Sequence, residues 1–140
     1  MGEPREVNPQ ILTNLEQSGM IPVIAPIGVG PNGETYNINA DTVAGAVASA
    51  IGAVRLLLLT DVPGVMDNDG NLLTDLTTSQ VRELMRDGTI TGGMIPKLET
   101  CLGALQTGAE AAVILDGRVP HVLLLEIFTE RGVGTLLRAD

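Results

Sequence analysis

Four consecutive leucines, Leu56 to Leu59, place the strongest constraint on the fold of this chain. A short, uninterrupted apolar run between turn residues is typical of a strand buried on both faces. We therefore predict a strand over Arg55 to Thr60. Three similar apolar runs are also interpreted as strands, over 21–27, 111–115 and 122–128, and Gly134 to Leu137 is predicted as a last short strand.

Helical patterns separate these runs. Asn8-Pro9 is typical of a helix start, and Thr77 with Gln80 has the spacing of a capping box. Small residues from Asp41 to Ile51 predict a helix packed closely on a sheet, and a further helix is predicted from about Met94 to Thr107. Strands that alternate with helices predict an α/β fold, in which a mainly parallel sheet is sandwiched by helices.

Length and composition limit the classes of function. The 140 residues are enough for one domain with a core, and that core is aliphatic because Tyr36 and Phe128 are the only aromatic residues. The net charge of −9 and the scattered basic residues disfavour nucleic acid as a partner. A single cysteine, Cys101, and a single histidine, His121, leave too few ligands for a zinc site, so no metal site is predicted. Without a leader or a membrane-spanning run, the expected location is the cytoplasm.

Residues 35–42, TYNINADT, are the most informative for function. Alternation along a strand would place Asn37, Asn39 and Asp41 on one face, at the end of a strand where open α/β sheets bind ligands. The competing interpretation is that these residues only turn the chain and cap the following helix. Both interpretations stay open on this segment alone.

Residues 28–33, GVGPNG, match a dinucleotide-binding pattern, which we reject. That pattern must open a helix directly and be followed by an acidic residue about 20 positions later. Pro31, Asn32 and Gly33 instead form a turn, and no carboxylate lies between Asp41 and Asp61.

Two loops have the chemistry of a phosphate or nucleotide site. Gly92-Gly93 precedes a helix, where free backbone N–H groups and the helix dipole favour an anion, and Lys97 lies one turn further on. Asp61 to Gly64 follows a buried strand, where nucleotide-contacting loops lie in α/β sheets. A glycine-rich linker and an ordinary Pro-Gly turn are the simpler alternatives.

Four segments in this order resemble the acetylglutamate kinases of the amino acid kinase family. They are TYNINADTVAGAVA, LLLLTDVPGVMD, TITGGMIPKLETCLGAL and HVLLLEIFTERGVGTLL. The resemblance covers nearly the whole chain, and residues 21–41 are similar to the bacterial enzymes of arginine biosynthesis. It implies phosphorylation of the side-chain carboxylate of N-acetyl-L-glutamate by ATP with Mg²⁺.

The resemblance also implies roles for individual residues. Lys97 is one of the catalytic lysines and stabilises charge on the transferring phosphoryl group. Asp41, the second catalytic residue, orients the catalytic lysines, while Asn37 and Asn39 bind substrate. The implied adenosine site consists of Asp61, Gly64, Val65, Met66, Thr89, Ile90, Thr91 and Met94. The segment from His121 to Thr135 resembles the signature of arginine-inhibited members, which makes Glu126 and Gly132 candidates for binding L-arginine. A strand end with a solvated Glu126 is the equal alternative.

The chain resembles only the later part of this family. Residues 1–53 correspond to a remnant of the substrate-binding lobe and 54–140 to the nucleotide-binding lobe, so the fold is expected to be incomplete at its N-terminal side. The family's Lys-x-Gly-Gly segment, second lysine and substrate arginine have no counterpart here. We therefore expect no significant kinase activity from this chain alone, and an exposed edge and apolar face that cause self-association or instability.

Other functions remain open. The chain can be a non-catalytic nucleotide-binding or assembly module, which would bind ATP without phosphoryl transfer. It can also be another member of the family, such as a carbamate, aspartate or glutamate kinase. A homo-oligomer that binds small molecules, with neither nucleic acid nor membrane as a partner, is expected in each case.

Overall fold

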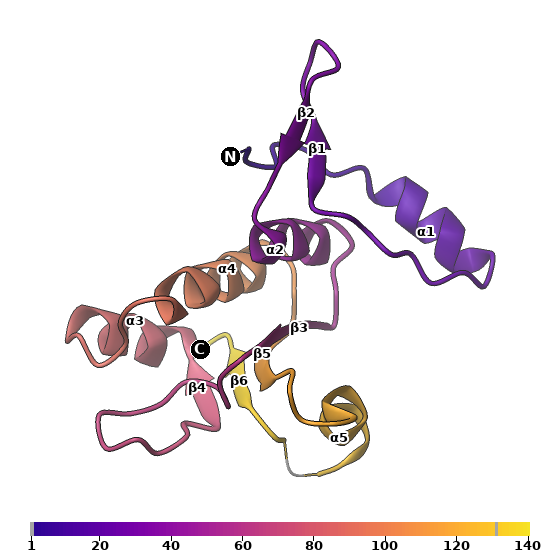
Figure 1. The fold of residues 1–140 in the computed structure, drawn as a ribbon. Coiled ribbons are helices and arrows are strands. Elements are labelled where there is room, and N and C mark those ends of the chain that lie inside the picture. Colours follow the sequence, from indigo (N-terminus) through magenta and orange to yellow (C-terminus); the bar gives the residue numbers. More distant parts are fainter. Residues whose placement is uncertain (1, 131) are drawn as a thin grey trace.

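A computed structural model describes residues 2–130 and 132–140. Within these residues, eleven elements follow one another along the chain (Figure 1). They are α1 (Pro9–Gln17), β1 (Ile27–Val29), β2 (Thr35–Asn37), α2 (Ala40–Ala50), β3 (Arg55–Thr60), β4 (Asp75–Thr77), α3 (Thr78–Arg86), α4 (Met94–Thr107), β5 (Ala111–Asp116), α5 (Val122–Phe128) and β6 (Thr135–Arg138).

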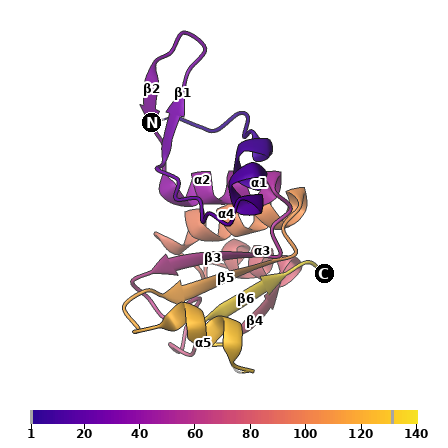
Figure 2. The ribbon, with the colours of Figure 1, turned by 90° about the vertical axis from the view of Figure 1, so that its right-hand side faces the viewer.

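The main sheet has four strands in the order β3-β5-β6-β4. β3 is parallel to β5 and β4 is parallel to β6, while β5 and β6 are antiparallel. The helices cover both faces: α2, α3 and α4 lie on one side and α5 on the other (Figure 2). This arrangement confirms the predicted α/β class, with a parallel-rich sheet between helices.

Alternate residues of the strands build a separate core on each face of the sheet. Leu56 and Leu58 point with Ile114 into the larger cluster, beneath α2, α3 and α4. Val113 and Leu115 point the other way and pack with Val122 of α5. The leucine run is therefore apolar at every position because both faces of β3 are covered over at least part of their length.

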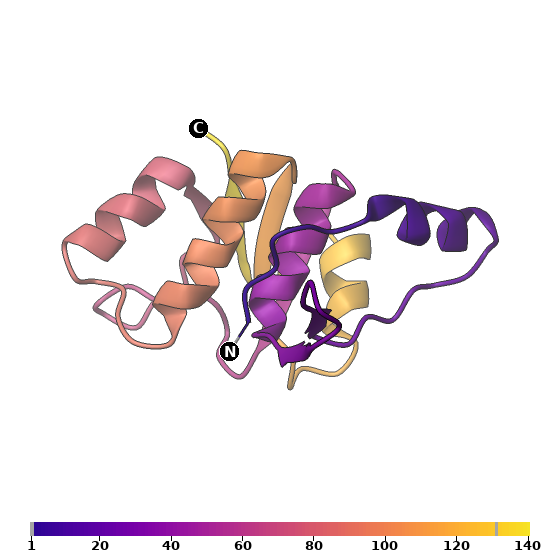
Figure 3. The same cartoon turned by 90° about the horizontal axis from the view of Figure 1, so that it is seen from above.

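Helices α2 and α4 lie side by side across the larger face (Figure 3). A glycine permits their close approach, because a Cβ added at Gly45 would lie only 2.7 Å from Thr100 Cγ2. Ser49 Oγ and Thr107 Oγ1 are 2.6 Å apart at the other end of the contact. The small residues of this helix were predicted to pack closely against a sheet, but the close contact at Gly45 is with α4.

The strand predicted over 21–27 is wrong. Only Ile27 to Val29 forms a strand, which pairs with β2 in a hairpin that projects from the rest of the chain (Figure 1). In the described part of the chain, no hydrogen bond involves the N–H of Ile21 or Val23, and these side chains are 91% and 95% exposed. An apolar run becomes a strand only where another strand pairs with it.

Residues 122–128 were also interpreted wrongly as a strand, since they form α5. Val122 and Glu126 are its buried residues, four positions apart on one side of the helix. The short strand β4 was not predicted, because only its central residue Leu76 is buried. The other predicted helices and strands are confirmed, including the capping box of Thr77 and Gln80.

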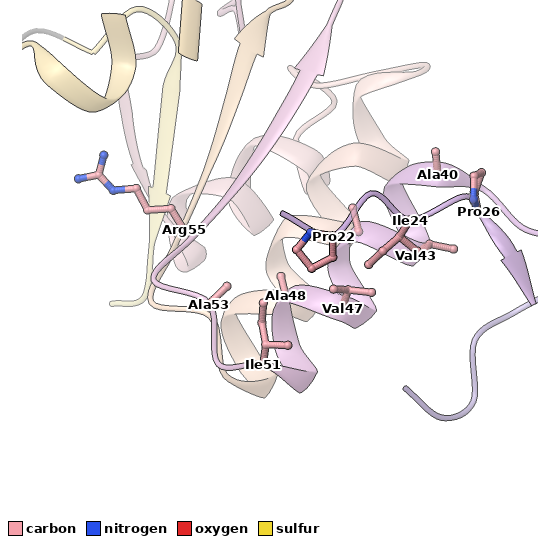
Figure 4. A pocket seen from close by; sticks show the side chains of 11 residues that line it. Pro22, Ile24, Pro26, Ala40, Val43, Val47, Ala48, Ile51, Ala53 and Arg55 are labelled. Atoms are coloured by element: carbon pink, nitrogen blue, oxygen red, sulfur yellow. The ribbon is translucent and has the colours of Figure 1, made fainter. Parts of the chain in front are cut away.

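An apolar hollow of about 310 Å³ lies between the connection that precedes β1 and α2 (Figure 4). Pro22 and Ile24 face Val43 and Val47 across it, and Arg55 at its rim points away from the other lining side chains. The alternation of inward Pro22 and Ile24 with outward Ile21 and Val23 is that of a strand with one uncovered face.

Candidate functional site

An ion pair between Asp41 and Lys97 joins segments 56 positions apart in the sequence. Lys97 Nζ lies 2.8 Å from Asp41 Oδ2, and the two side chains are only 23% and 26% exposed. A half-buried carboxylate therefore fixes the position of the ammonium group. The resemblance to the family implies that these two residues converge, and the ion pair shows that they do.

The topology explains why the pair forms. Asp41 lies in the first turn of α2 and Lys97 in the first turn of α4. Each helix is followed by a short connection into a parallel strand, β3 or β5, so each helix begins near the carboxyl ends of these strands. This is the edge of an open α/β sheet at which ligands bind.

The alternation predicted through Asp41 ends at Asn37, the last residue of β2. Asn39 caps α2, because its Oδ1 accepts hydrogen bonds from the N–H of Thr42 at 3.2 Å and from the hydroxyl of Thr42. Asn39 is therefore a helix cap, as the competing interpretation predicts. Asn37 remains exposed on the hairpin, and Asn39 also lines a hollow of about 350 Å³ next to Gly2 and Glu3.

The first turn of α4 has the features of an anion site. Its N-cap is Gly93, and no side chain caps it. Cβ atoms added at Gly92 or Gly93 would meet no heavy atom of the described residues within 4 Å, so space adjoins the backbone there. The helix dipole and the Lys97 ammonium favour negative charge at this helix end, although the N–H of Ile95 donates to the carbonyl of Gly92 at 3.3 Å and Pro96 has no N–H.

The segments that the resemblance assigns to adenosine are neighbours at the same edge. Asn68 Nδ2, beside the loop Asp61–Met66, donates to Thr89 Oγ1 at 3.2 Å. Thr89 leads through the buried Ile90 and the exposed Thr91 to Met94, the first residue of α4. One side-chain hydrogen bond therefore links the segment after the first loop to the second, and the second loop leads into the first turn of α4, which contains Lys97.

The thiol of Cys101 lies fully buried one turn beyond Lys97. Burial raises its pKa to about 12, and the negative charge of Asp41 adds to this effect while Lys97 opposes it. A thiol that stays protonated is a poor nucleophile. Cys101 therefore contributes packing to the site.

Glu126 and Gly132 come together beside the β5–α5 side of the sheet. Glu126 Oε2 accepts from the N–H of Val133 at 3.2 Å, and a Cβ added at Gly132 would lie 3.1 Å from the same oxygen. Arg55 NH1 lies 4.0 Å from the other oxygen. Glu126 is 8% exposed, so the alternative of a solvated glutamate is wrong.

Sequence reasoning missed Asp116 and Arg118, which follow β5. The Arg118 guanidinium donates to both carboxylate oxygens of Asp116, at 2.9 and 2.8 Å. These hydrogen bonds lower the pKa of Asp116 to about 2. A carboxylate at the end of a predicted strand was the available signal. The pair lies beside the loop at Asp61, because the N–H of Gly117 donates to the carbonyl of Thr60.

The described residues contain no group of three or more His, Cys, Asp or Glu side chains that could hold a metal ion. Within the same residues, no helix is both long and apolar enough to span a bilayer. The rejected glycine pattern at 28–33 runs from β1 into the turn of the β1–β2 hairpin and opens no helix.

Residues 2–116 match the amino acid kinase family. The acetylglutamate kinase of Novosphingobium aromaticivorans is 64% identical over 139 residues, which are 99% of this chain and 46% of that protein. That of Erythrobacter litoralis is 64% identical over 140 residues, all of this chain and 47% of that protein. The chain thus spans about half the length of the curated relatives it matches.

Solved structures have the same fold. The N-acetylglutamate synthase of Neisseria gonorrhoeae, complexed with coenzyme A and L-arginine, matches with a TM-score of 0.90 and 27% identity over 96% of this chain and 31% of that one. The carbamate kinase of Giardia lamblia bound to AMP-PNP matches with a TM-score of 0.73 over 99% of this chain and 46% of that one. At 22% identity, the likeness between the two structures shows a shared fold and nothing further.

Proposed function

Because the chain belongs to the amino acid kinase family, we propose that it supplies the ATP-binding half of an acetylglutamate kinase. The reaction is phosphorylation of the side-chain carboxylate of N-acetyl-L-glutamate by MgATP, a step of arginine biosynthesis. Residues 54–140 are the nucleotide-binding lobe in this proposal, and residues 1–53 are part of the substrate-binding lobe. The names of the relatives and the position of Lys97 support it.

The Asp41–Lys97 pair is the observation that carries the proposal. Transfer of a phosphoryl group to a carboxylate brings two anions together, so positioning and positive charge supply most of the catalysis. Lys97 provides an ammonium at the start of α4, and Asp41 prevents it from turning away. In this proposal Lys97 is catalytic and Asp41 holds its charge in place.

The residues around α4 fit the phosphates of ATP, since open backbone at Gly92 and Gly93 adjoins Lys97. The adenosine contacts come from Asp61, the stretch 64–66, the stretch 89–91 and Met94. The described residues offer no cluster of metal ligands, so Mg²⁺ is carried mainly by the nucleotide phosphates and water, as Mg²⁺ commonly is. Bound in this way, Mg²⁺ neutralises charge on the phosphates.

The acceptor site includes Asn37 and Asn39. Asn39 adjoins a hollow, but its oxygen is already used as a helix cap, so its amide nitrogen is the group available to a carboxylate. L-arginine is proposed to bind at Glu126 and Gly132. Glu126 already faces one guanidinium, that of Arg55, and a carboxylate suits such a group.

Titration with MgATP tests the nucleotide half of the proposal. We expect saturable binding to the 140-residue chain, and a loss of about tenfold or more in affinity for Lys97→Ala, because a charge-assisted contact is removed. Arg86→Ala is the matched control, since Arg86 is an exposed cation that pairs only weakly with Glu83, at 3.9 Å. Equal affinity of the Lys97 and Arg86 variants would contradict the assignment of Lys97.

A coupled assay for ADP release with N-acetylglutamate separates the remaining functions. We expect ATP binding with no significant turnover by this chain alone. ATP binding with no effect of N-acetylglutamate would favour a nucleotide-binding or assembly module. Turnover with carbamate, aspartate or glutamate in place of N-acetylglutamate would identify another activity of the family.

A further inference from the structure

Thr135, in the last strand β6, anchors the loop from Asp61 to Met66 by a hydrogen bond. Thr135 is fully buried, at 0% exposure. Its Oγ1 accepts a hydrogen bond from the N–H of Val65 at 2.8 Å and donates one to the carbonyl of Leu73 at 2.6 Å. One hydroxyl therefore joins β6 to Val65, within this loop, and to Leu73, which lies a few residues after the loop.

Among the described residues, the hydrogen bonds that anchor the backbone of this loop to other segments are those of Val65. Asp61, Val62 and Pro63 are exposed, whereas Val65 is 1% exposed. The carbonyl of Val65 accepts from the N–H of Leu73 at 2.8 Å, so both backbone groups of Val65 are engaged. The path of the exposed residues thus depends on where the N–H of Val65 is anchored.

Gly64, which precedes Val65, leaves the space that the contact with Thr135 needs. Gly64 has φ +152°, and a Cβ added there would lie 2.5 Å from Thr135 Oγ1 and 2.8 Å from Leu72 Cδ1. Any larger residue would push the loop away from the hydroxyl. Gly64 and Thr135 therefore form one fitted contact between the loop and β6.

Pairing between β6 and β5 fixes the position of Thr135. Thr135 is the first residue of β6 and is in register with Ile114 of β5. It therefore lies under the carboxyl end of β5, where the chain crosses from β3 toward β4. Because β6 is an inner strand of the sheet, the position of Thr135 is fixed, and the loop that bonds to Thr135 is held in place by it.

We propose that Thr135 is a positioning residue for the nucleotide site, because its hydroxyl sets the path of the loop Asp61–Met66. This inference rests on the proposed function, in which that loop contacts adenosine. Thr135 itself touches no ligand. It acts through the N–H of Val65, and the loop is presented in its binding conformation only while that hydrogen bond exists.

Substitution by valine keeps the shape of the side chain and removes the hydroxyl. The buried N–H of Val65 and the carbonyl of Leu73 then lose a partner, so the loop must shift to bring them to water. Serine keeps the hydroxyl and both hydrogen bonds. Leu137→Val is the matched control, because Leu137 is equally buried in β6 but is not bonded to the loop.

The experiment compares Thr135→Val, Thr135→Ser and Leu137→Val in the full chain. Nucleotide affinity is measured by titration with MgATP, and protection of the Val65 amide by hydrogen exchange. We expect Thr135→Val to lose protection at Val65 and about tenfold in affinity, the size of one lost buried hydrogen bond. Thr135→Ser should keep most of both properties, and Leu137→Val should keep both while it loses global stability. If Thr135→Val does not fold, Thr135→Ala, which also removes the hydroxyl, tests the same hydrogen bonds.

Each outcome has a distinct meaning. Unchanged affinity in Thr135→Val, or a loss of affinity in Leu137→Val as large as in Thr135→Val, would overturn the positioning role. Failure of Thr135→Ser to restore affinity would also overturn it. If the unchanged chain binds no MgATP, the proposed function fails and the positioning role fails with it, even where exchange at Val65 responds as expected.

Discussion

Asp140 connects the end of β6 to the start of α3 through its side chain. Its carboxylate accepts hydrogen bonds from the hydroxyls of Thr78 and Ser79 and from the N–H of Ser79. A carboxylate at the first turn of a helix is also favoured by the helix dipole. The hydrogen bonds from Thr78, Thr77 and Ser79, in that order, lower the pKa of Asp140 from 3.8 to about 2.

This pKa predicts a dependence of stability on pH. A carboxyl with a lower pKa in the folded state stabilises the fold above the unfolded value of 3.8, and this contribution is lost as the pH falls through about 2. We expect the difference in the free energy of unfolding between the unchanged chain and Asp140→Asn to shrink over that range. Urea unfolding at a series of pH values measures it. Asp69→Asn, at an exposed turn, is the control, and a difference for Asp140→Asn that does not vary with pH would contradict the prediction.

At the scale of elements, the contact between α2 and α4 brings Asp41 to Lys97. The two helices cross where α2 has Gly45, and a larger residue there would contact Thr100 of α4. The separation of the helices therefore sets the distance between the two charged groups near their N-terminal ends. Gly45 therefore affects the site through the packing of the two helices, since it has no side chain that could bind a ligand.

Two glycine substitutions test this contact. Gly45→Ala gains helix propensity but forces Thr100 to move, so we expect a net loss of about 1 to 2 kcal/mol in the free energy of unfolding. A Cβ added at Gly103 in α4 meets no heavy atom of the described residues within 4 Å, so Gly103→Ala should stabilise the chain by about 0.5 to 1 kcal/mol. Thermal and denaturant unfolding measure both, and a stabilised Gly45→Ala would show that the helices are not in tight contact.

At the scale of the whole molecule, the chain has one well-packed region and one exposed apolar region. The first contains the sheet with α2, α3, α4 and α5 (Figure 2). The second contains α1, which has no buried residue, and the connection over 20–26 that follows it. Strand β3 adds a free edge, because it pairs only with β5 among the described strands.

These features predict self-association of the chain, since exposed apolar surface and a free strand edge favour contact between copies. We expect light scattering to give a mass above that of one chain, rising with concentration. Ile21→Lys combined with Val23→Lys should lower this mass, because both side chains are more than 90% exposed and the fold does not need them. Leu124→Lys combined with Phe128→Lys is the control pair, because it adds the same charges to α5. A monomer at every concentration, or a larger effect of the α5 pair, would refute the prediction.

The sequence was sufficient to predict most helices, the strands β3, β5 and β6, and the layered α/β arrangement. Local chemistry determines these features: Asn8 and Thr77 cap their helices by short-range hydrogen bonds, and four leucines in succession require cover on two faces. The convergence of Asp41 with Lys97 was also predicted, but only because the whole pattern resembled a family.

Tertiary structure decided the remainder. An apolar run does not specify its partner, so the runs 21–26 and 122–128 are both largely apolar but become an open connection and a helix. The contact between Thr135 and Val65 spans 70 residues, and no spacing rule reaches that far. Local preferences act over a few positions, whereas burial and long-range hydrogen bonds exist only after distant segments have packed together.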